Sequence, residues 1–244
     1  MKVLVTRPNG EGQALCHELA AHGIAASHQP LLDIITAPSA NRTPPLWPHV
    51  DVIIAVSQHA VYHADAILKK NAFSWPSQAH YLAVGQKTAH YLSKASQQHV
   101  HFPEISDSEH LLQLPELGDL TNQQVVIMRG NGGRELIYDT LQQRGAFVTY
   151  WETYQRQWHQ FDAAAALKQW QQDGINALII TSAEQLHYFV TQCAPYGLAA
   201  VCQWQLWVPS ERIAMLARQH GFTHVVAVGS ASNSAFINAL ISRL

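Results

Sequence analysis

The chain has 244 residues, a formal net charge of −2 and a charged fraction of 13%, against about 25% in an average protein. Nucleic-acid-binding proteins usually carry a clear basic excess, so this balance argues against that class of partner. No stretch approaches the roughly 20 consecutive apolar residues of a membrane-spanning helix, and MKVLVTRPNG leads into no apolar core of a signal peptide. We therefore expect a cytoplasmic protein with no nucleic-acid or membrane partner, long enough for two domains of roughly 100 to 150 residues each.

The cysteines are too few and too scattered for a disulfide framework. Cys16, Cys193 and Cys202 are odd in number and show no CxxC spacing. We interpret them as reduced packing residues.

The sequence contains an internal repeat. VLVTRPNGEGQALCHELAAHGIAAS at 3–27 aligns without a gap with VVIMRGNGGRELIYDTLQQRGAFVT at 125–149, an offset of 129 − 7 = 122 between Arg7 and Arg129. Three further pairs follow at an offset of 125, starting at Ile53 and Leu178, Tyr81 and Leu206, and Val100 and Val225. Two similar lobes built from one chain predict a cleft between them, and clefts are common binding sites.

The first repeat has the form of a βα unit. Residues 3–5 predict a strand, 7–10 a polar turn, and 12–22 a helix with apolar residues at helical spacing and Gly23 as its stop. Downstream, residues 37–48 hold four prolines. They predict a surface loop, because proline lacks the backbone donor that a strand needs.

The second repeat has the same form. Its strand leads through the turn at 130–133 into a helix that ends at Gly145. YWETYQRQWHQF at 150–161 has strand character and precedes a helix of strong formers at 163–172. This run and HQPLLDII at 28–35 are the best candidates for connections between the lobes. Strands apolar on both faces that alternate with helices predict parallel sheets covered on both sides, so the fold class is α/β, twice.

Small or hydroxyl-bearing residues stand at the expected helix starts of both halves: Ser57, Gly85, Ser106 and Ser108 in one, Ser182, Ser210, Ser230 and Ser232 in the other. Helix N-termini offer unpaired N–H groups and a partial positive charge to carboxylates and phosphates. For any single serine, an ordinary N-cap worth about 1 kcal/mol is the simpler interpretation. Together they predict an anion-lined cleft, because parallel α/β sheets point all these turns to one carboxyl edge.

Arg7 and Arg129 end equivalent strands and would bind an anionic ligand with planar, bidentate hydrogen bonds. A duplication would repeat these arginines even if they bound no ligand. Substrate binding and simple inheritance from the duplication therefore both stay open as interpretations. RGNGG at 129–133 resembles a phosphate nest. Neither GxGxxG nor GxxxxGK[ST] occurs, so a nucleotide-dependent α/β enzyme would lack a recognisable phosphate loop.

Histidine and tyrosine supply the remaining candidates. His59 and His63, two of 15 histidines, have the i, i+4 spacing of one helical face. No HExxH pattern accompanies them, and we interpret the histidines as surface residues, with no metal site. Ser57 near His59 makes no triad, because GxSxG is missing.

Tyr154 is the candidate proton donor, since a phenol with a reference pKa of about 10 stays protonated at pH 7. The alternative is a buried aromatic residue whose hydroxyl is satisfied by backbone.

Seven short motifs occur in order along the whole chain: LVTRP at Leu4, SQHAV at Ser57, AVGQKTA at Ala83, IMRGNGGRE at Ile127, ETYQR at Glu152, ITSAE at Ile180 and VPSERIA at Val208. Each is loose alone, but together they closely resemble bacterial uroporphyrinogen-III synthases. RGNGGRE with YQR is the most distinctive pair. Thr153 stands where many members of that family have cysteine.

The resemblance implies an enzyme, a cyclising hydro-lyase of tetrapyrrole (haem and sirohaem) biosynthesis. The family takes hydroxymethylbilane, a linear tetrapyrrole with acetate and propionate carboxylates on every ring. It closes this substrate to uroporphyrinogen III with inversion of ring D and loss of water, and it needs no metal or organic cofactor. The resemblance further implies a monomer and a transient handover of substrate from hydroxymethylbilane synthase.

The resemblance also implies an exchange of units between two similar lobes, each a parallel β-sheet flanked by helices. Lobe 1 would comprise residues 1–35 plus 157–244 and lobe 2 residues 36–156. A two-stranded connection near 31–36 and 150–156 would join them. The repeat itself is equally compatible with a simple split between its two copies.

By position, the resemblance carries the role of proton donor onto Tyr154. It carries substrate binding onto eight further residues: Arg7, Ser57, Gln58, Gly85, Thr88, Arg129, Ser182 and Ser210. The alternative from another class is a cytoplasmic two-lobed binding or sensor protein that closes on a small polyanionic metabolite without chemistry.

Overall fold

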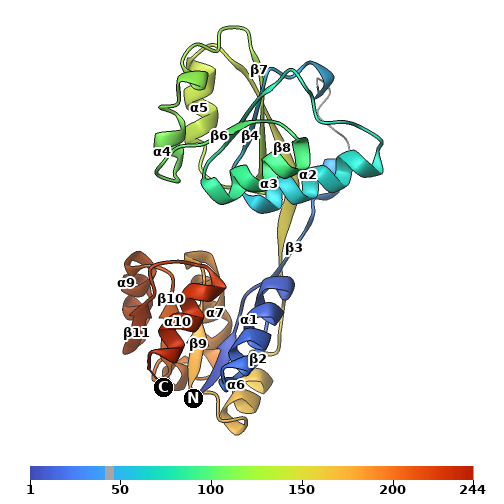
Figure 1. Ribbon diagram of the computed structural model, residues 1–244. Coiled ribbons are helices and arrows are strands. Elements are labelled where there is room, and N and C mark those ends of the chain that lie inside the picture. The colour runs from blue at the N-terminus through green and yellow to red at the C-terminus, as the bar shows by residue number, and fades with distance from the viewer. Residues whose placement is uncertain (42–46, 244) are drawn as a thin grey trace. The chain divides into compact units, whose positions relative to one another are not determined.

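The computed structural model describes residues 1–41 and 47–243. The chain forms two compact units, one made of Met1–Asp33 with Gln157–Leu244 and the other of Ile34–Arg156 (Figure 1). Unit 1 is therefore discontinuous in sequence, whereas unit 2 is a single stretch.

Unit 1 is built on a five-stranded sheet in the order β11-β10-β9-β1-β2, in which all neighbours pair in parallel. Its strands are β1 (Lys2–Val5), β2 (Ala25–His28), β9 (Ala177–Ile179), β10 (Gln205–Val208) and β11 (His224–Ala227). Its α-helices are α1 (Asn9–Ala21), α6 (Ala163–Gln172), α7 (Ala183–Cys193), α8 (Leu198–Val201), α9 (Glu211–Gln219) and α10 (Asn233–Ile241).

The central strand β1 shows that this sheet is covered on both faces. Leu4 packs in an apolar cluster with Leu178 and Phe189. Val3 and Val5 point the other way, into a second cluster. Val3, Leu4 and Val5 are all fully buried, so the strand is apolar on both faces, as expected for a parallel sheet between helices.

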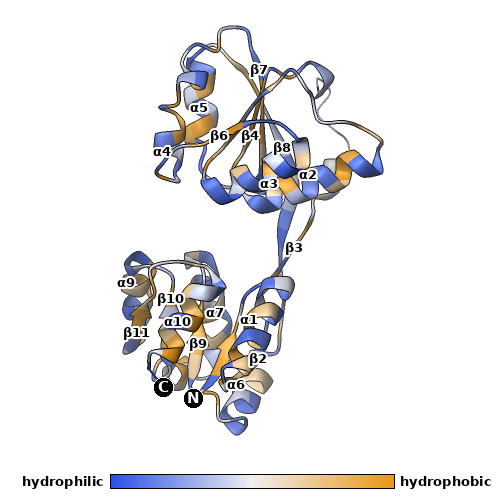
Figure 2. Cartoon of the chain, in the orientation of Figure 1, coloured by the Kyte–Doolittle hydropathy of each residue, from blue (hydrophilic) through white to orange (hydrophobic). Residues whose placement is uncertain are grey.

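Unit 2 contains a six-stranded sheet in the order β3-β8-β7-β4-β5-β6. Its strands are β3 (Leu32–Thr36), β4 (Val52–Ala55), β5 (His80–Ala83), β6 (Val100–His101), β7 (Gln124–Gly130) and β8 (Phe147–Trp158). Its α-helices are α2 (Gln58–Lys70), α3 (Gln86–Ser96), α4 (Ser108–Leu111) and α5 (Leu136–Gln143). Helices α2 and α3 carry hydrophobic and hydrophilic stretches side by side in Figure 2, as helices that cover a sheet do.

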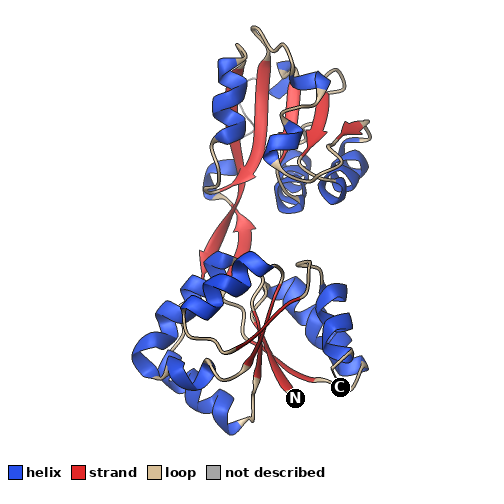
Figure 3. Ribbon diagram, turned by 90° about the vertical axis from the view of Figure 1, so that its left-hand side faces the viewer, coloured by secondary structure: helices blue, strands red, loops and turns tan. Residues whose placement is uncertain are grey.

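β3 and β8 connect the two units. The unit boundaries fall inside these strands, after Asp33 and after Arg156. The two strands are neighbours in the sheet, and Figure 3 shows them running in opposite directions. The strand character expected at 150–161 is confirmed over most of that run.

The two copies of the repeat begin their helices differently. α1 starts at Asn9, earlier than the predicted residue 12, directly after Pro8, whose φ of −51° suits a helix entry. In the second copy, Gly132 and Gly133 have φ of +80° and +130°, which no residue of a right-handed helix adopts. Helix α5 therefore starts only at Leu136.

The predicted surface loop at 37–48 is wrong at its end. Pro38–Asn41 and Trp47–His49 form short 3₁₀ turns, and 42–46 lie outside the described residues. Trp47 is buried, and its indole N–H donates to the carbonyl of Ser74. The large apolar ring outweighs the loop preference of its proline neighbours.

Candidate functional site

Tyr154 lies in β8 beside an irregularity in the pairing with β7. Arg129 pairs with Glu152, but the next residue, Gly130, pairs with Tyr154, so Thr153 is an extra residue in β8. Side chains alternate between the faces of a strand, and a bulge shifts that alternation by one position. The bulge therefore turns Tyr154 to the face opposite the one that simple alternation predicts.

The apolar clusters of unit 2 identify the two faces of its sheet. Tyr154 belongs to the cluster that contains Ala60 and Val61 of α2. Ile127 belongs to the cluster on the other face, and Tyr150 packs against it. Tyr154 therefore lies under the beginning of α2.

Thr153 holds the bulge in place. The side chain is fully buried, and its hydroxyl donates to the carbonyl oxygen of Ala60 at 3.0 Å. The threonine hydroxyl therefore ties β8 to α2 at the bulge.

The Tyr154 side chain is 5% exposed and closely surrounded. Ser57 Oγ donates to its hydroxyl oxygen at 3.2 Å. The rings of His59 and His63 lie 5.8 and 5.9 Å away, centre to centre, and His63 is stacked on Tyr154. The sequence alternative is thus half right: Tyr154 is buried, but its hydroxyl bonds to a side chain and not to backbone.

Gly130 lies directly against the Tyr154 ring. A Cβ on Gly130 would be 2.5 Å from the Cε2 and Cζ atoms of that ring, far inside van der Waals contact. The first glycine of RGNGG is thus required by the tyrosine, a role that the sequence pattern did not reveal.

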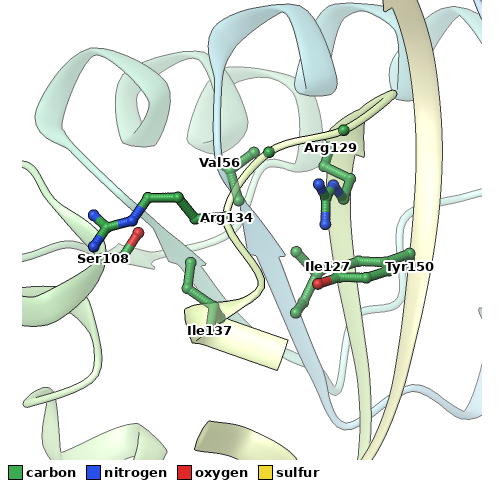
Figure 4. A pocket seen from close by; sticks show the side chains of 9 residues that line it. Val56, Ser108, Ile127, Arg129, Arg134, Ile137 and Tyr150 are labelled. Atoms are coloured by element: carbon green, nitrogen blue, oxygen red, sulfur yellow. The ribbon is translucent and has the colours of Figure 1, made fainter. Parts of the chain in front are cut away.

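Arg129 lies on the opposite face of the sheet from Tyr154. It is 5% exposed, its guanidinium carbon is 4.2 Å from the centre of the Tyr150 ring, and Nη1 donates to Glu135 at 3.1 Å. A cavity of about 150 Å³ lies here, with Arg134 and Ile137 also in its wall. Figure 4 shows the Arg129 guanidinium above the Tyr150 ring.

Glu135 neutralises Arg129. The Tyr150 hydroxyl donates to Glu135, and this bond, followed by Arg129, lowers the pKa of the Glu135 carboxyl. Burial and the bond to Glu135 raise the pKa of Tyr150. A substrate carboxylate that binds Arg129 must therefore compete with Glu135, a residue that sequence analysis missed because its counterpart in the first copy is Gln13 and not an acid.

Arg7 in unit 1 has a similar environment. It is 8% exposed, and it donates to the Glu11 carboxylate and to the carbonyl of Ala231 in the loop after β11. His28 Nε2 lies 2.9 Å from the Arg7 carbonyl oxygen. Both repeated arginines are thus buried at strand ends and paired with a nearby glutamate.

The remaining candidates of unit 1 stand at the carboxyl ends of neighbouring strands. Ser182 follows β9 and caps α7, accepting from the N–H of Gln185 at 3.1 Å. Ser210 follows β10 at the N-cap of α9, with no side-chain cap bond. Since β1 is the next strand of the same sheet, Arg7, Ser182 and Ser210 share one edge of unit 1.

In unit 2 the corresponding edge carries the starts of α2 and α3. Ser57 is the N-cap of α2, and Gln58 is its first residue. Gly85 is the N-cap of α3, and Thr88 is buried in its first turn.

Ser106 and Ser108 were expected at the next helix start, but α4 is capped by Asp107, whose carboxylate accepts from the N–H of His110 at 2.8 Å. An aspartate is as good a cap as a serine.

The histidine interpretation needs a correction at one position. His63 is 7% exposed, in the core beside Tyr154, and burial followed by the charge of His59 lowers its pKa. Across residues 1–41 and 47–243, no group of three or more His, Cys, Asp or Glu residues is arranged to hold a metal ion. Over the same residues, no helix has the length and apolar character needed to cross a bilayer.

Known proteins resemble this chain over its full length. The family model described as uroporphyrinogen-III synthase HemD matches residues 13–237. The uroporphyrinogen-III synthases of Salmonella typhimurium strain LT2 and Escherichia coli strain K12 are each 37% identical, over 98% of this chain and 100% of their own length.

Solved structures share the fold. A mutant uroporphyrinogen III synthase from the extremely thermophilic bacterium Thermus thermophilus superposes with a TM-score of 0.68 at 17% identity, covering 100% of this chain and 98% of the other. The Helicobacter pylori uroporphyrinogen-III synthetase gives a TM-score of 0.60 at 14% identity, over 100% and 99%. With the family model matched along nearly the whole sequence, the chain belongs to the uroporphyrinogen-III synthase family.

Proposed function

We propose that this protein converts hydroxymethylbilane to uroporphyrinogen III, closing the tetrapyrrole with inversion of ring D and release of water. The observation that carries the proposal is the 37% identity, over 98% of this chain, to two relatives named for that activity. The sequence motifs quoted above run through the same length.

Tyr154 is the proposed proton donor. Departure of the substrate hydroxyl as water is assisted by the electron pair of the pyrrole nitrogen, so a weak acid suffices. The azafulvenium cation that remains is attacked by the substituted α-carbon of ring D, and fragmentation and reclosure of the resulting spiro intermediate, a protonated pyrrolenine, invert that ring. The phenol lies on the strand that carries the YQR motif, and its hydroxyl oxygen accepts from Ser57.

The carboxylates of the substrate are proposed to bind at the helix starts and at the two repeated arginines. The unpaired N–H groups of helix N-termini suit carboxylates, and a guanidinium adds bidentate hydrogen bonds. The binding residues are Arg7, Ser57, Gln58, Gly85, Thr88, Arg129, Ser182 and Ser210. Many weak contacts suit a flexible polyanion, and holding it in one folded conformation supplies most of the rate.

The remaining proposals concern the surroundings of the enzyme. It acts as a monomer in the cytoplasm, without a metal or organic cofactor. It receives hydroxymethylbilane by transient handover from the synthase that makes this compound.

The test is a coupled assay with freshly made hydroxymethylbilane, in which chromatography separates the type III product from type I. We expect type III product from the unaltered protein. Tyr154→Phe should lower kcat by about 100-fold, the size of a typical general-acid contribution, with residual activity and unchanged folding by circular dichroism. Formation of type I product alone would reject the proposed activity, and binding of the substrate without turnover would favour the sensor alternative.

A further inference from the structure

The hydroxyl of Ser57 takes part in two hydrogen bonds at once. It accepts from the N–H of Ala60 at 3.1 Å, as an ordinary N-cap of α2. It also donates to the Tyr154 hydroxyl oxygen at 3.2 Å. The capping bond explains the helix start, but the second bond has no part in capping.

The direction of the second bond matters for proton transfer. Because Ser57 is the donor, the bond uses a lone pair of Tyr154 and leaves the phenolic proton outside it. When the phenol gives up that proton, its oxygen becomes negative, and a hydrogen bond to a charged acceptor is stronger than one to a neutral acceptor. The N-terminus of α2 adds a partial positive charge on the same side.

We propose that Ser57 is a positioning residue that acts through Tyr154: its hydroxyl stabilises the phenolate that forms when the proton moves to the leaving hydroxyl. The inference rests on the proposed function, which assigns Tyr154 as proton donor and the backbone at the start of α2 to substrate binding. It adds a task for the Ser57 side chain that substrate binding does not require.

The surrounding residues keep the phenol oxygen at Ser57. Gly130 lies against one part of the ring with no room for a Cβ, and His63 is stacked on the ring. The bulge at Thr153 fixes the direction of the side chain, and the Thr153 hydroxyl ties that bulge to α2. The oxygen therefore needs little reorganisation when charge develops on it.

The proton balance closes within the reaction. The phenolic proton joins the departing hydroxyl, the carbon–oxygen bond of the substrate breaks, and water leaves. The proton lost when the last pyrrole regains its aromaticity restores the phenol. No oxidant, reductant or further reactant enters.

The test compares Ser57→Ala and Ser57→Thr in two backgrounds, the unaltered protein and Tyr154→Phe, with initial rates of type III product formation from hydroxymethylbilane. In the unaltered background we expect Ser57→Ala to lower kcat about tenfold or more, as for a lost hydrogen bond to a charged group. We expect KM to change by less than about twofold, because the backbone N–H groups at the helix start remain. Ser57→Thr keeps a hydroxyl and should restore most of kcat.

In the Tyr154→Phe background, Ser57→Ala should change kcat by less than about twofold, since no phenolate forms there. Asp162→Ala is the matched control: Asp162 caps α6 by accepting from the N–H of Ala165, so this variant loses a similar cap at a residue with no proposed part in binding or catalysis. An equal fall in kcat from Ser57→Ala in both backgrounds, or a change in KM alone, would overturn the inference. Absence of type III product from the unaltered protein would instead reject the proposed function itself.

Discussion

At the scale of single residues, the two repeated arginines share one arrangement. Each is buried at a strand end, and each donates to a glutamate that is about half exposed, Glu11 for Arg7 and Glu135 for Arg129. Burying a guanidinium without a partner would be costly. The ion pairs with these glutamates therefore stabilise the buried arginines when no substrate is bound. The same glutamates then compete with substrate carboxylates.

Substitution of either arginine should therefore affect binding more than chemistry. We expect Arg7→Met and Arg129→Met each to raise KM by about tenfold, the loss of one charge-assisted contact among many, with a smaller fall in kcat. Arg218→Met, which removes an exposed pair with Glu211, is the control and should leave both constants unchanged. Complete loss of turnover at saturating substrate would contradict distributed binding.

Glu135→Gln should act in the opposite direction. Removing the competing charge from Arg129 should lower KM about two- to fivefold, as expected for a partly exposed ion pair, and leave kcat unchanged. The effect is measured by steady-state kinetics of this variant, with Glu211→Gln as the control. An increase in KM would mean that Glu135 holds Arg129 in its binding geometry.

His63 should make stability depend on pH. Its pKa in the folded protein is lowered, by burial first and then by His59, and its neighbours are Thr36, Tyr62 and Tyr154. Between that lowered pKa and the unfolded value of about 6.5, only the unfolded chain binds the proton. Stability from His63 is therefore full above about pH 6.5 and falls as the pH drops toward the folded pKa.

The measurement is Tm between about pH 7.5 and 5.5, a range that spans the unfolded pKa, for the unaltered protein and for His63→Gln, which cannot take up a proton. We expect a smaller fall in Tm on acidification for the variant. His90→Gln, at an exposed position, should behave like the unaltered protein. Parallel curves for all three would show that His63 does not link folding to pH.

At the scale of elements, the bulge in β8 and the glycine opposite it together set the position of the Tyr154 ring. Without the bulge, regular pairing through Thr153 would turn Tyr154 to the side of Arg129. If Gly130 carried a side chain, the Tyr154 ring would not fit against β7. The distinctive RGNGG and YQR motifs thus contact each other across two paired strands.

Gly130→Ala should therefore disturb catalysis through the tyrosine. The new Cβ would push the ring by an ångström or so, and a displacement of that size costs about 100-fold in rate, with little change in KM. Gly10→Ala is the contrast, since nothing lies within 4 Å of its Cβ position in α1. That variant should keep its activity and gain roughly 0.5 to 1 kcal/mol of stability. Equal activity of both variants would remove Gly130 from the mechanism.

At the scale of the whole molecule, the sequence repeat and the compact units do not coincide. In unit 2, β7 and β8 of the second copy lie between β3 and β4 of the first. A fragment of residues 32–158 holds all six strands of this sheet, whereas a fragment of residues 1–122 lacks two central ones. We expect only the first fragment to show a cooperative thermal transition by circular dichroism. Cooperative folding of residues 1–122 would contradict this view.

Local patterns in the sequence were enough to predict the fold class and the family of this protein. Strands that are apolar on both faces and alternate with helices require parallel sheets covered by helices. This pattern can be recognised in Val3, Leu4 and Val5 without knowledge of the residues that they contact. Helix 163–172 was predicted at its observed bounds because a run of strong helix formers is a local signal. The motifs in order along the chain identified the family, which the comparisons confirm.

Tertiary structure decided what depends on contacts distant in sequence. Trp47, expected in a surface loop, lies in the core and donates to the carbonyl of Ser74. Which face Tyr154 takes depends on one unpaired residue between two strands, and a one-residue shift leaves no trace in a hydrophobic pattern. The bond from Ser57 to Tyr154 joins residues 97 positions apart, so only the folded sheet brings the helix cap and the phenol together.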